Sequence, residues 1–188
     1  MPGKKRRSAD ESRAHILEVA ARRLREQGLE GLNITGVAED AGLSHATLIH
    51  HFGSSGGMRD ALADKMTQEL VTDLMDAMNA GVDPGNVAKN VFSALAEGGH
   101  AKLLAWRAVE GHDDPSNQLV VRELFDKLLT TTQKVIDIDS REELQRIILL
   151  VATAAIGYGI AGEVLTNVMG MDAENVESFP AWVTEIVG

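Results

Sequence analysis

Residues 33–52, NITGVAEDAGLSHATLIHHF, constrain the fold of this chain more than any other segment. Counted from Ile34, the small residue Ala38 comes fifth and Gly42 comes ninth. Leu48 follows as the fifteenth residue. Two short helices that cross at a tight turn have this spacing, because the crossing favours a small side chain and the turn favours a left-handed glycine. The segment therefore predicts a helix-turn-helix.

Capping residues mark where the two helices are expected to begin. Asn33 precedes the first helix and Ser44 precedes the second, and both side chains are suited to accept a hydrogen bond from a backbone amide of the first turn. The second helix is short and carries small polar side chains that are able to reach base edges in DNA. We predict that it is a recognition helix.

A recurring pattern of apolar and small residues surrounds these helices. The matching residues are Ile16, Leu17, Ala20, Ala21, Leu24 and Gly28, then Val37, Ala38, Ala41, Gly42, Leu43, Ser44, Thr47, Leu48, His51 and Phe52. In these positions about the first 65 residues of the chain resemble the TetR/AcrR family of transcriptional regulators. The resemblance implies a three-helix DNA-binding head, followed by a helical body that pairs with a second copy and encloses a small-molecule pocket.

Four positions depart from the family's pattern. Ile49 replaces a Tyr, and Ser55, which two glycines follow, replaces the Lys that opens the fourth helix. His45 stands where the family has Lys, and Ala46 where it has Gly. Because Ile49 has no hydroxyl and Ser55 has no charge, we expect weaker electrostatic affinity for DNA unless other groups supply it.

Two other features are candidate phosphate contacts. The N-terminal tail, residues 1–8, holds four consecutive cations from Lys4 to Arg7, and it is either a DNA-binding arm or a solvated end. The amides that open the fourth helix also suit a phosphate. The side chains that we expect to form the DNA-contacting surface are Thr35, Ser44, His45, Ala46, Thr47, His50, His51 and Ser55.

Composition limits the possible functions. The chain has 188 residues, enough for a sizeable core, and no cysteine, which excludes disulfides, thiolate metal sites and a cysteine nucleophile. Residues 1–52 carry eight Lys or Arg against seven Asp or Glu, whereas the rest of the chain carries ten against 21. An acidic body directs DNA to the N-terminal part.

Neither a signal peptide nor a membrane span is expected. The basic start leads into an amphipathic helix, and the longest uncharged stretch, residues 147–162, has sixteen residues where a span needs about 20. We interpret this stretch as a buried helix, and we expect a cytoplasmic protein without membrane contact.

Helix signals recur along the chain and strand signals do not, so we predict an all-α fold of about nine helices. The domains are expected at residues 1–53, the DNA-binding head, and 54–188, the ligand-binding and dimerisation body. Helix starts are marked by capping boxes and by Asp-Pro pairs: Ser8 with Glu11, Ser140 with Glu143, Asp83 with Pro84, and Asp114 with Pro115.

The apolar helix over residues 147–162 has no polar face and must be covered on every side. A stripe of small residues along it offers a flat surface for another helix, either within a monomeric core or in a two-fold homodimer. The resemblance favours the dimer, and a two-fold dimer implies a near-palindromic operator. The expected dimer interface consists of Ile148, Ala152, Ala155, Gly159 and Gly162.

The ligand pocket that the resemblance implies is expected among large apolar residues of the body, most of which serve as plain core. The candidates are Met66, Leu70, Phe92, Leu95, Leu103, Trp106, Val109, Phe125 and Tyr158. His100 and His112 do not share one helical face and lack a carboxylate at ligand spacing, so neither a metal nor a cofactor is expected.

These features favour a repressor that an unidentified small-molecule effector releases from DNA. An enzyme is disfavoured, because the chain has no phosphate loop, no metal cluster and no nucleophile paired with a base. The alternative is a helical dimer that binds small molecules or proteins and has weakened DNA affinity, as Ile49, Ser55 and the acidic body indicate.

Overall fold

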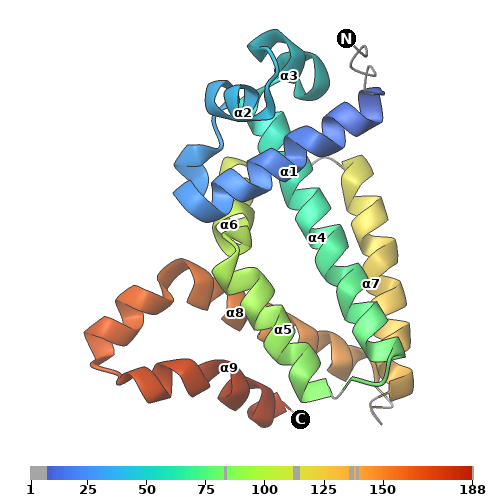
Figure 1. Ribbon diagram of the computed structural model, residues 1–188. Coiled ribbons are helices and arrows are strands. Elements are labelled where there is room, and N and C mark those ends of the chain that lie inside the picture. Colours follow the sequence, from blue (N-terminus) through green and yellow to red (C-terminus); the bar gives the residue numbers. More distant parts are fainter. Residues whose placement is uncertain (1–7, 83, 112–114, 136–137, 139, 188) are drawn as a thin grey trace. The chain divides into compact units, whose positions relative to one another are not determined.

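The computed structural model describes residues 8–82, 84–111, 115–135, 138 and 140–187. These residues form nine α-helices and one 3-10 helix, and none of them lies in a strand (Figure 1). The all-α fold predicted from the sequence is therefore confirmed. The chain divides into two compact units, residues 1–63 and 64–188.

The first unit contains the predicted helix-turn-helix. Its elements are α1 (Ala9–Gln27), η1 (Gly28–Gly31), α2 (Ile34–Ala41), α3 (His45–Phe52) and the first turns of α4 (Ser55–Asn79). Gly42 ends α2 in the left-handed conformation with φ of 66°, as the spacing predicted. The buried faces of these helices carry the apolar residues of the sequence pattern, among them Ile16, Leu24, Val37 and Leu48.

Side chains close the helix N-termini of this unit. Ser8 and Glu11 form the predicted capping box, Asn33 accepts from the amide of Gly36, and Ser44 accepts from the amide of Thr47. At the start of α4 the hydroxyl of Ser54 accepts from the amide of Gly57 at 3.0 Å. Ser54 is therefore the cap of α4.

The boundary between the units lies after Ala63, ten residues beyond the one expected from the sequence at 53. The first two turns of α4 belong to the head because their polar side chains bond to its backbone. Ser55 donates to the carbonyl of Leu32 at 3.1 Å, and Arg59 donates to the carbonyls of Leu32 and Leu29, both at 3.3 Å.

The second unit consists of the rest of α4 and five further helices. These are α5 (Pro84–Glu97), α6 (His100–Glu110), α7 (Pro115–Val135), α8 (Arg141–Met169) and α9 (Ala173–Val187). Ser140 caps α8 by accepting from the amide of Glu143 at 3.2 Å. The expected caps Asp83 and Asp114 lie outside the described residues, as does the basic stretch from Lys4 to Arg7.

Two buried clusters form the core of the second unit. One joins α5, α8 and α9 through Phe92, Leu95, Val151, Ala155 and Val183. The other joins α4 and α7 through Val71, Leu74, Met78 and Leu128. Leu70 and Val91 pack against both clusters, so the body is held together around two centres.

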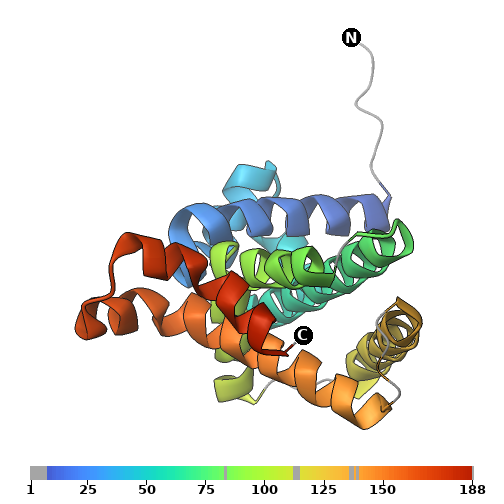
Figure 2. The same ribbon diagram turned by 90° about the horizontal axis from the view of Figure 1, so that it is seen from below.

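Helix α8 packs most extensively on α5, and α9 turns back along it (Figures 1 and 2). The small-residue stripe that we expected at a dimer interface faces this internal contact. Ala155 is fully buried, and a Cβ built on Gly159 would lie 2.8 Å from the Cα of Ala96 in α5 and 2.9 Å from the Cβ of Ala101 in α6.

The other residues of the stripe also face their own chain. Ile148 and Ala152 line an internal cavity, and Gly162 is buried beneath the ring of Tyr158. The assignment of Ile148, Ala152, Ala155, Gly159 and Gly162 to a dimer interface stays a prediction, and within the protomer these residues face their own chain. The helices that need the close approach are α5 and α6 of the same protomer.

Gly157 and Gly159 provide a matched test of this packing. Gly159→Ala is expected to lower the free energy of unfolding by about 1 to 3 kcal/mol, because backbone atoms of α5 and α6 must move. Gly157→Ala on the same helix has open space around its Cβ and should stabilise by about 0.5 to 1 kcal/mol through helix propensity. Urea unfolding of both variants measures the difference. Equal stabilisation by both would contradict the internal placement of Gly159.

Candidate nucleic-acid interface and ligand pocket

The helix α3 is fixed from its C-terminal end by α1. The guanidinium of Arg13 donates to the carbonyl of His51 at 3.0 Å and lies 4.5 Å from the centre of the Phe52 ring. A cation over an aromatic face adds to the hydrogen bond. Arg13 therefore orients α3 and leaves uncovered the face of α3 that carries exposed polar residues.

Arg23 fixes α2 in a similar way. Its guanidinium donates to the carbonyl of Gly31 at 2.7 Å and to the carboxylate of Asp40 at 2.8 Å. This hydrogen bond holds the pKa of the Asp40 carboxyl below its usual value. Gly36 leaves room for the guanidinium, since a Cβ at that position would clash with it. Both helices of the motif are thus tied to the same helix, α1.

Most of the residues expected to contact DNA lie on the surface. Five are exposed, Thr35, Ser44, His45, Ala46 and His50, and two are half-buried, Thr47 and His51. The hydroxyls of Ser44 and Thr47 lie 2.8 Å apart at the start of α3. The motif therefore presents a polar surface at the N-terminal end of α3.

Ser55 stands apart from this surface. It is half-buried and its hydroxyl is engaged with the carbonyl of Leu32. In this conformation the side chain ties α4 to the head and does not offer its proton to a phosphate. Ile49, in contrast, is 38% exposed and adds an apolar patch to α3.

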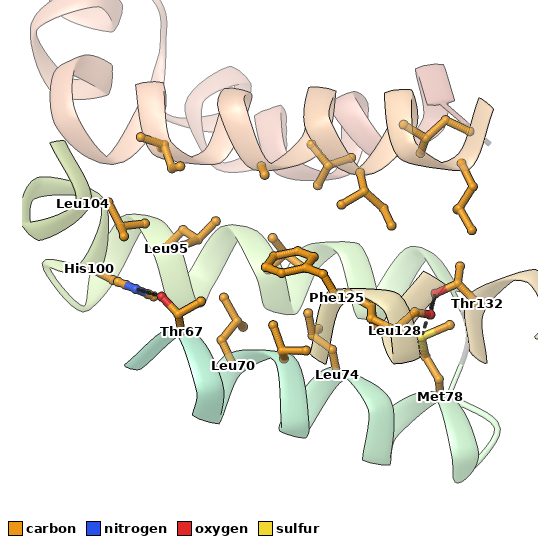
Figure 3. Close-up of a pocket in the computed structure, with 18 of the residues that line it drawn as sticks. Thr67, Leu70, Leu74, Met78, Leu95, His100, Leu104, Phe125, Leu128 and Thr132 are labelled. Atoms are coloured by element: carbon orange, nitrogen blue, oxygen red, sulfur yellow. Dashed lines mark hydrogen bonds between the residues drawn. The ribbon is translucent and has the colours of Figure 1, made fainter. Parts of the chain in front are cut away.

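The second unit encloses a cavity of about 220 Å³ between α4, α5, α7 and α8 (Figure 3). An engineered apolar cavity of roughly 150 Å³ is large enough to hold benzene. This cavity lies where the two core clusters meet, since Leu95 and Val151 of one cluster and Val71 and Leu74 of the other line it. It therefore has room for a small organic molecule.

The cavity wall is apolar except at its ends. The imidazole of His100 and the hydroxyl of Thr67 lie 3.1 Å apart at one end (Figure 3). Thr132 lies at the other end, where its hydroxyl donates to the carbonyl of Leu128 at 2.8 Å. His100 is only 2% exposed, and burial lowers the pKa of its imidazole to about 4. The ring is therefore neutral at neutral pH.

Two polar links join α4 to α6 beside the cavity. The first is the bond between Thr67 and His100, and the second is a mostly buried ion pair, 2.5 Å long, between Asp64 and Arg107. Asp64 and Thr67 are three residues apart, so the two links share one face of α4.

Comparison with known proteins gives the family of the N-terminal part of this chain. Residues 16–62, which include the helix-turn-helix, match the bacterial regulatory proteins of the tetR family. This N-terminal part of the chain therefore has the DNA-binding domain of the tetR family.

Individual relatives match parts of the chain. It is 38% identical over 79 residues to the HTH-type transcriptional regulatory protein RaaS of Mycobacterium tuberculosis, which covers 42% of this chain and 36% of RaaS. It is 25% identical over 128 residues to the nucleoid occlusion factor SlmA of Pasteurella multocida, covering 65% of this chain and 64% of SlmA. The chain thus spans about one to two thirds of these relatives.

One solved structure matches almost the whole fold. It is a transcriptional regulator from Rhodococcus sp. Rha1, with a TM-score of 0.63 at 21% identity, covering 94% of this chain and 95% of that one. The body therefore has the fold of that structure.

The ligand-site prediction stays untested, and the residues that it named divide between the cavity wall and other places in the body. Of the nine expected residues, Leu70, Leu95 and Phe125 line it. Val109 is 85% exposed, Phe92 and Leu103 are buried core, and Met66, Trp106 and Tyr158 do not line this cavity. Large apolar residues at helical spacing serve more often as packing than as ligand contacts, which is why spacing alone did not separate the cavity wall from the core.

Sequence reasoning missed Thr67, His100 and Thr132, the polar residues of the cavity. Thr67 continues the stripe of Val71, Leu74 and Met78 along α4, and a polar residue on an apolar stripe is a signal that could have been used. His100 was considered only as a metal ligand. Its burial depends on contacts between helices and could not be deduced from spacing.

The face of α8 opposite the buried stripe is apolar and exposed. Its residues are Leu149, Leu150, Thr153, Gly157, Ile160, Val164 and Val168, which we call the outer face of α8. Val164 is 64% exposed and Val168 is 79% exposed. The segment expected to be a buried helix is therefore covered on one side within the single chain, and the cover of its other side stays a prediction.

By length and composition alone, α8 is also apolar enough to cross a membrane, and only 17% of its most apolar window is buried. Such a helix in isolation is weak evidence for a span. An exposed apolar patch of this kind is typical of an interaction surface.

Proposed function

We propose that this protein is a dimeric transcriptional repressor that binds a near-palindromic operator and leaves it when a small molecule enters the cavity of its body. The observation that carries the proposal is a helix-turn-helix whose second helix keeps its N-terminal polar residues exposed. These residues suit base and phosphate contacts in a major groove.

Helix α4 supports the link between ligand and DNA. It is continuous from Ser55 in the head to Asn79 in the body, and Thr67, Leu70 and Leu74 on it line the cavity. A ligand changes DNA affinity only if it prefers one of two states of the protein. A tenfold release requires a preference of about 1.4 kcal/mol, a modest demand on a mostly apolar site.

Dimerisation through the outer face of α8 supports a two-fold operator. This face and the exposed Trp182 and Ile186 of α9 are apolar and uncovered in the protomer. A second copy would cover both surfaces and present two equivalent recognition helices.

Thr47 provides the test of DNA recognition. Thr47→Val keeps the shape of the side chain and removes its hydroxyl, and it should weaken binding to the operator by about 1 to 3 kcal/mol. Thr47→Ser keeps the hydroxyl and should bind nearly as the wild type does. Mobility-shift titrations at several salt concentrations measure both, and affinity should fall as salt rises.

The control for this test is thermal unfolding, because Thr47→Val also loses the contact with Ser44. A folded Thr47→Val protein that binds the operator as tightly as the wild type would remove Thr47 from the contact surface. Wild-type binding that is equal on all sequences would exclude a specific operator.

Ser55 and Ile49 favour a second candidate function, a helical ligand-binding dimer with weak DNA affinity. The hydroxyl of Ser55 is engaged within the head, and Ile49 exposes hydrocarbon on α3. Failure to bind DNA even at low salt, together with normal dimerisation, would favour this function over repression.

A further inference from the structure

One end of the cavity offers a polar group that is still able to form a hydrogen bond with a ligand. At the far end, the hydroxyl of Thr132 already donates its proton to the carbonyl of Leu128. At the near end, the hydroxyl of Thr67 and the ring of His100 are bonded to each other. A hydroxyl has one proton and two lone pairs, so Thr67 keeps a further donor or acceptor after this bond is made.

This remaining capacity exists for either tautomer of His100. If the imidazole accepts from Thr67, the threonine oxygen is able to accept from a ligand. If the imidazole donates to Thr67, the threonine proton is available to a ligand oxygen. A ligand hydroxyl fits both cases, and a carbonyl fits the second.

Charge argues against an ionised ligand. Among the described residues that line the cavity none carries a charged side chain, and the nearby cation Arg107 is already paired with Asp64. A carboxylate or ammonium group would lose its hydration there without gaining a counter-ion, which costs several kcal/mol.

The length and the composition of the cavity wall indicate what the rest of the ligand is. On α4 the lining residues extend from Thr67 to Met78, and these positions are separated by about 16 Å along the helix axis. Between these ends the wall consists of Leu, Val, Ile, Ala and Phe side chains, which favour hydrocarbon.

We propose that the cavity binds a neutral, largely hydrocarbon molecule with a hydroxyl or carbonyl group at one end, and that this group bonds to Thr67 beside His100. The inference rests on the proposed function in taking the cavity as the effector site. It adds the chemical class of the effector and its orientation in the cavity, with the polar end at Thr67.

The test uses three probes of equal chain length on the full-length protein at pH 7.4: 1-decanol, decanoate and decylammonium. Calorimetric titration in the absence of DNA should show that decanol binds at least about tenfold more tightly than either charged probe. Tighter binding of a charged probe, or no binding of decanol, overturns the proposal.

Threonine variants test which end of the cavity holds the polar group of the ligand. Thr67→Val should weaken decanol binding about three- to tenfold, the loss of one hydrogen bond. Thr72→Val is the matched control, since Thr72 lies on the same helix, is exposed and donates to the carbonyl of Gln68. It should bind decanol as the wild type does. Thermal unfolding verifies that the variants fold. If Thr132→Val weakens decanol binding more than Thr67→Val does, the hydroxyl of decanol lies at the Thr132 end of the cavity. That result would overturn the assignment.

The DNA response separates this proposal from the proposed function. If decanol binds as expected but leaves operator affinity unchanged, the ligand class stands and the effector role fails. If only decanoate or decylammonium binds and releases DNA, the effector role stands and the ligand class fails.

Discussion

Replacing Val164 with Glu is expected to convert the proposed dimer into monomers. Val164 lies in the outer face of α8 and is 64% exposed in the protomer. In a two-fold dimer each substitution occurs twice, and each places a carboxylate without a partner in an apolar contact. One uncompensated buried charge costs about 3 to 5 kcal/mol. The dimer dissociation constant should therefore rise at least about a hundredfold.

Val109→Glu is the control for this variant. It makes the same change at a site on α6 that is 85% exposed and lies outside the outer face of α8. Light scattering at micromolar concentration should find this variant dimeric and Val164→Glu monomeric. If Val164→Glu remains dimeric, the interface lies elsewhere. A wild-type monomer that associates with phospholipid vesicles would assign the outer face of α8 to a membrane.

Acidification is expected to destabilise the protein through His100. The pKa of this buried imidazole is about 4 in the folded chain, compared with 6.5 for an unperturbed histidine. As pH falls below 6.5, the unfolded chain takes up the proton while the folded chain does not, so the free energy of unfolding decreases. The decrease ends near pH 4, where both states are protonated, and amounts to about 3 kcal/mol.

The variant His100→Gln isolates this contribution, because all other titrating groups are common to both proteins. Urea unfolding from pH 7 to pH 4 should show that stability falls more steeply in the wild type. The gap between the two curves should change by about 3 kcal/mol over this range. Parallel curves would mean that His100 is able to take up its proton in the folded protein.

The local features of the head could be predicted from the sequence. Asn33, Ser44 and Gly42 act over three or four residues, through bonds within one turn of helix, so their roles follow from residue type and spacing. The same reasoning gave the all-α fold and the cap of α8 at Ser140. These features need no knowledge of distant contacts.

Which segment packs on each helix face, and which group bonds to each polar side chain, depended on the tertiary structure. The small-residue stripe of α8 was recognised as a site of close helix contact, yet residue spacing does not distinguish α5 of the same chain from α8 of a second copy. Ser55 was expected in the DNA-contacting surface, whereas the fold brings the carbonyl of Leu32, 23 residues earlier, within reach of its hydroxyl.

The sequence by itself determined the helices, their caps and the helix-turn-helix, since these depend on interactions between near neighbours. The tertiary structure decided which apolar residues line a cavity and which fill the core. It also paired Thr67 with His100, residues 33 positions apart on different helices. Burial and side-chain pairing of this kind arise from packing between distant segments, and no local pattern encodes them.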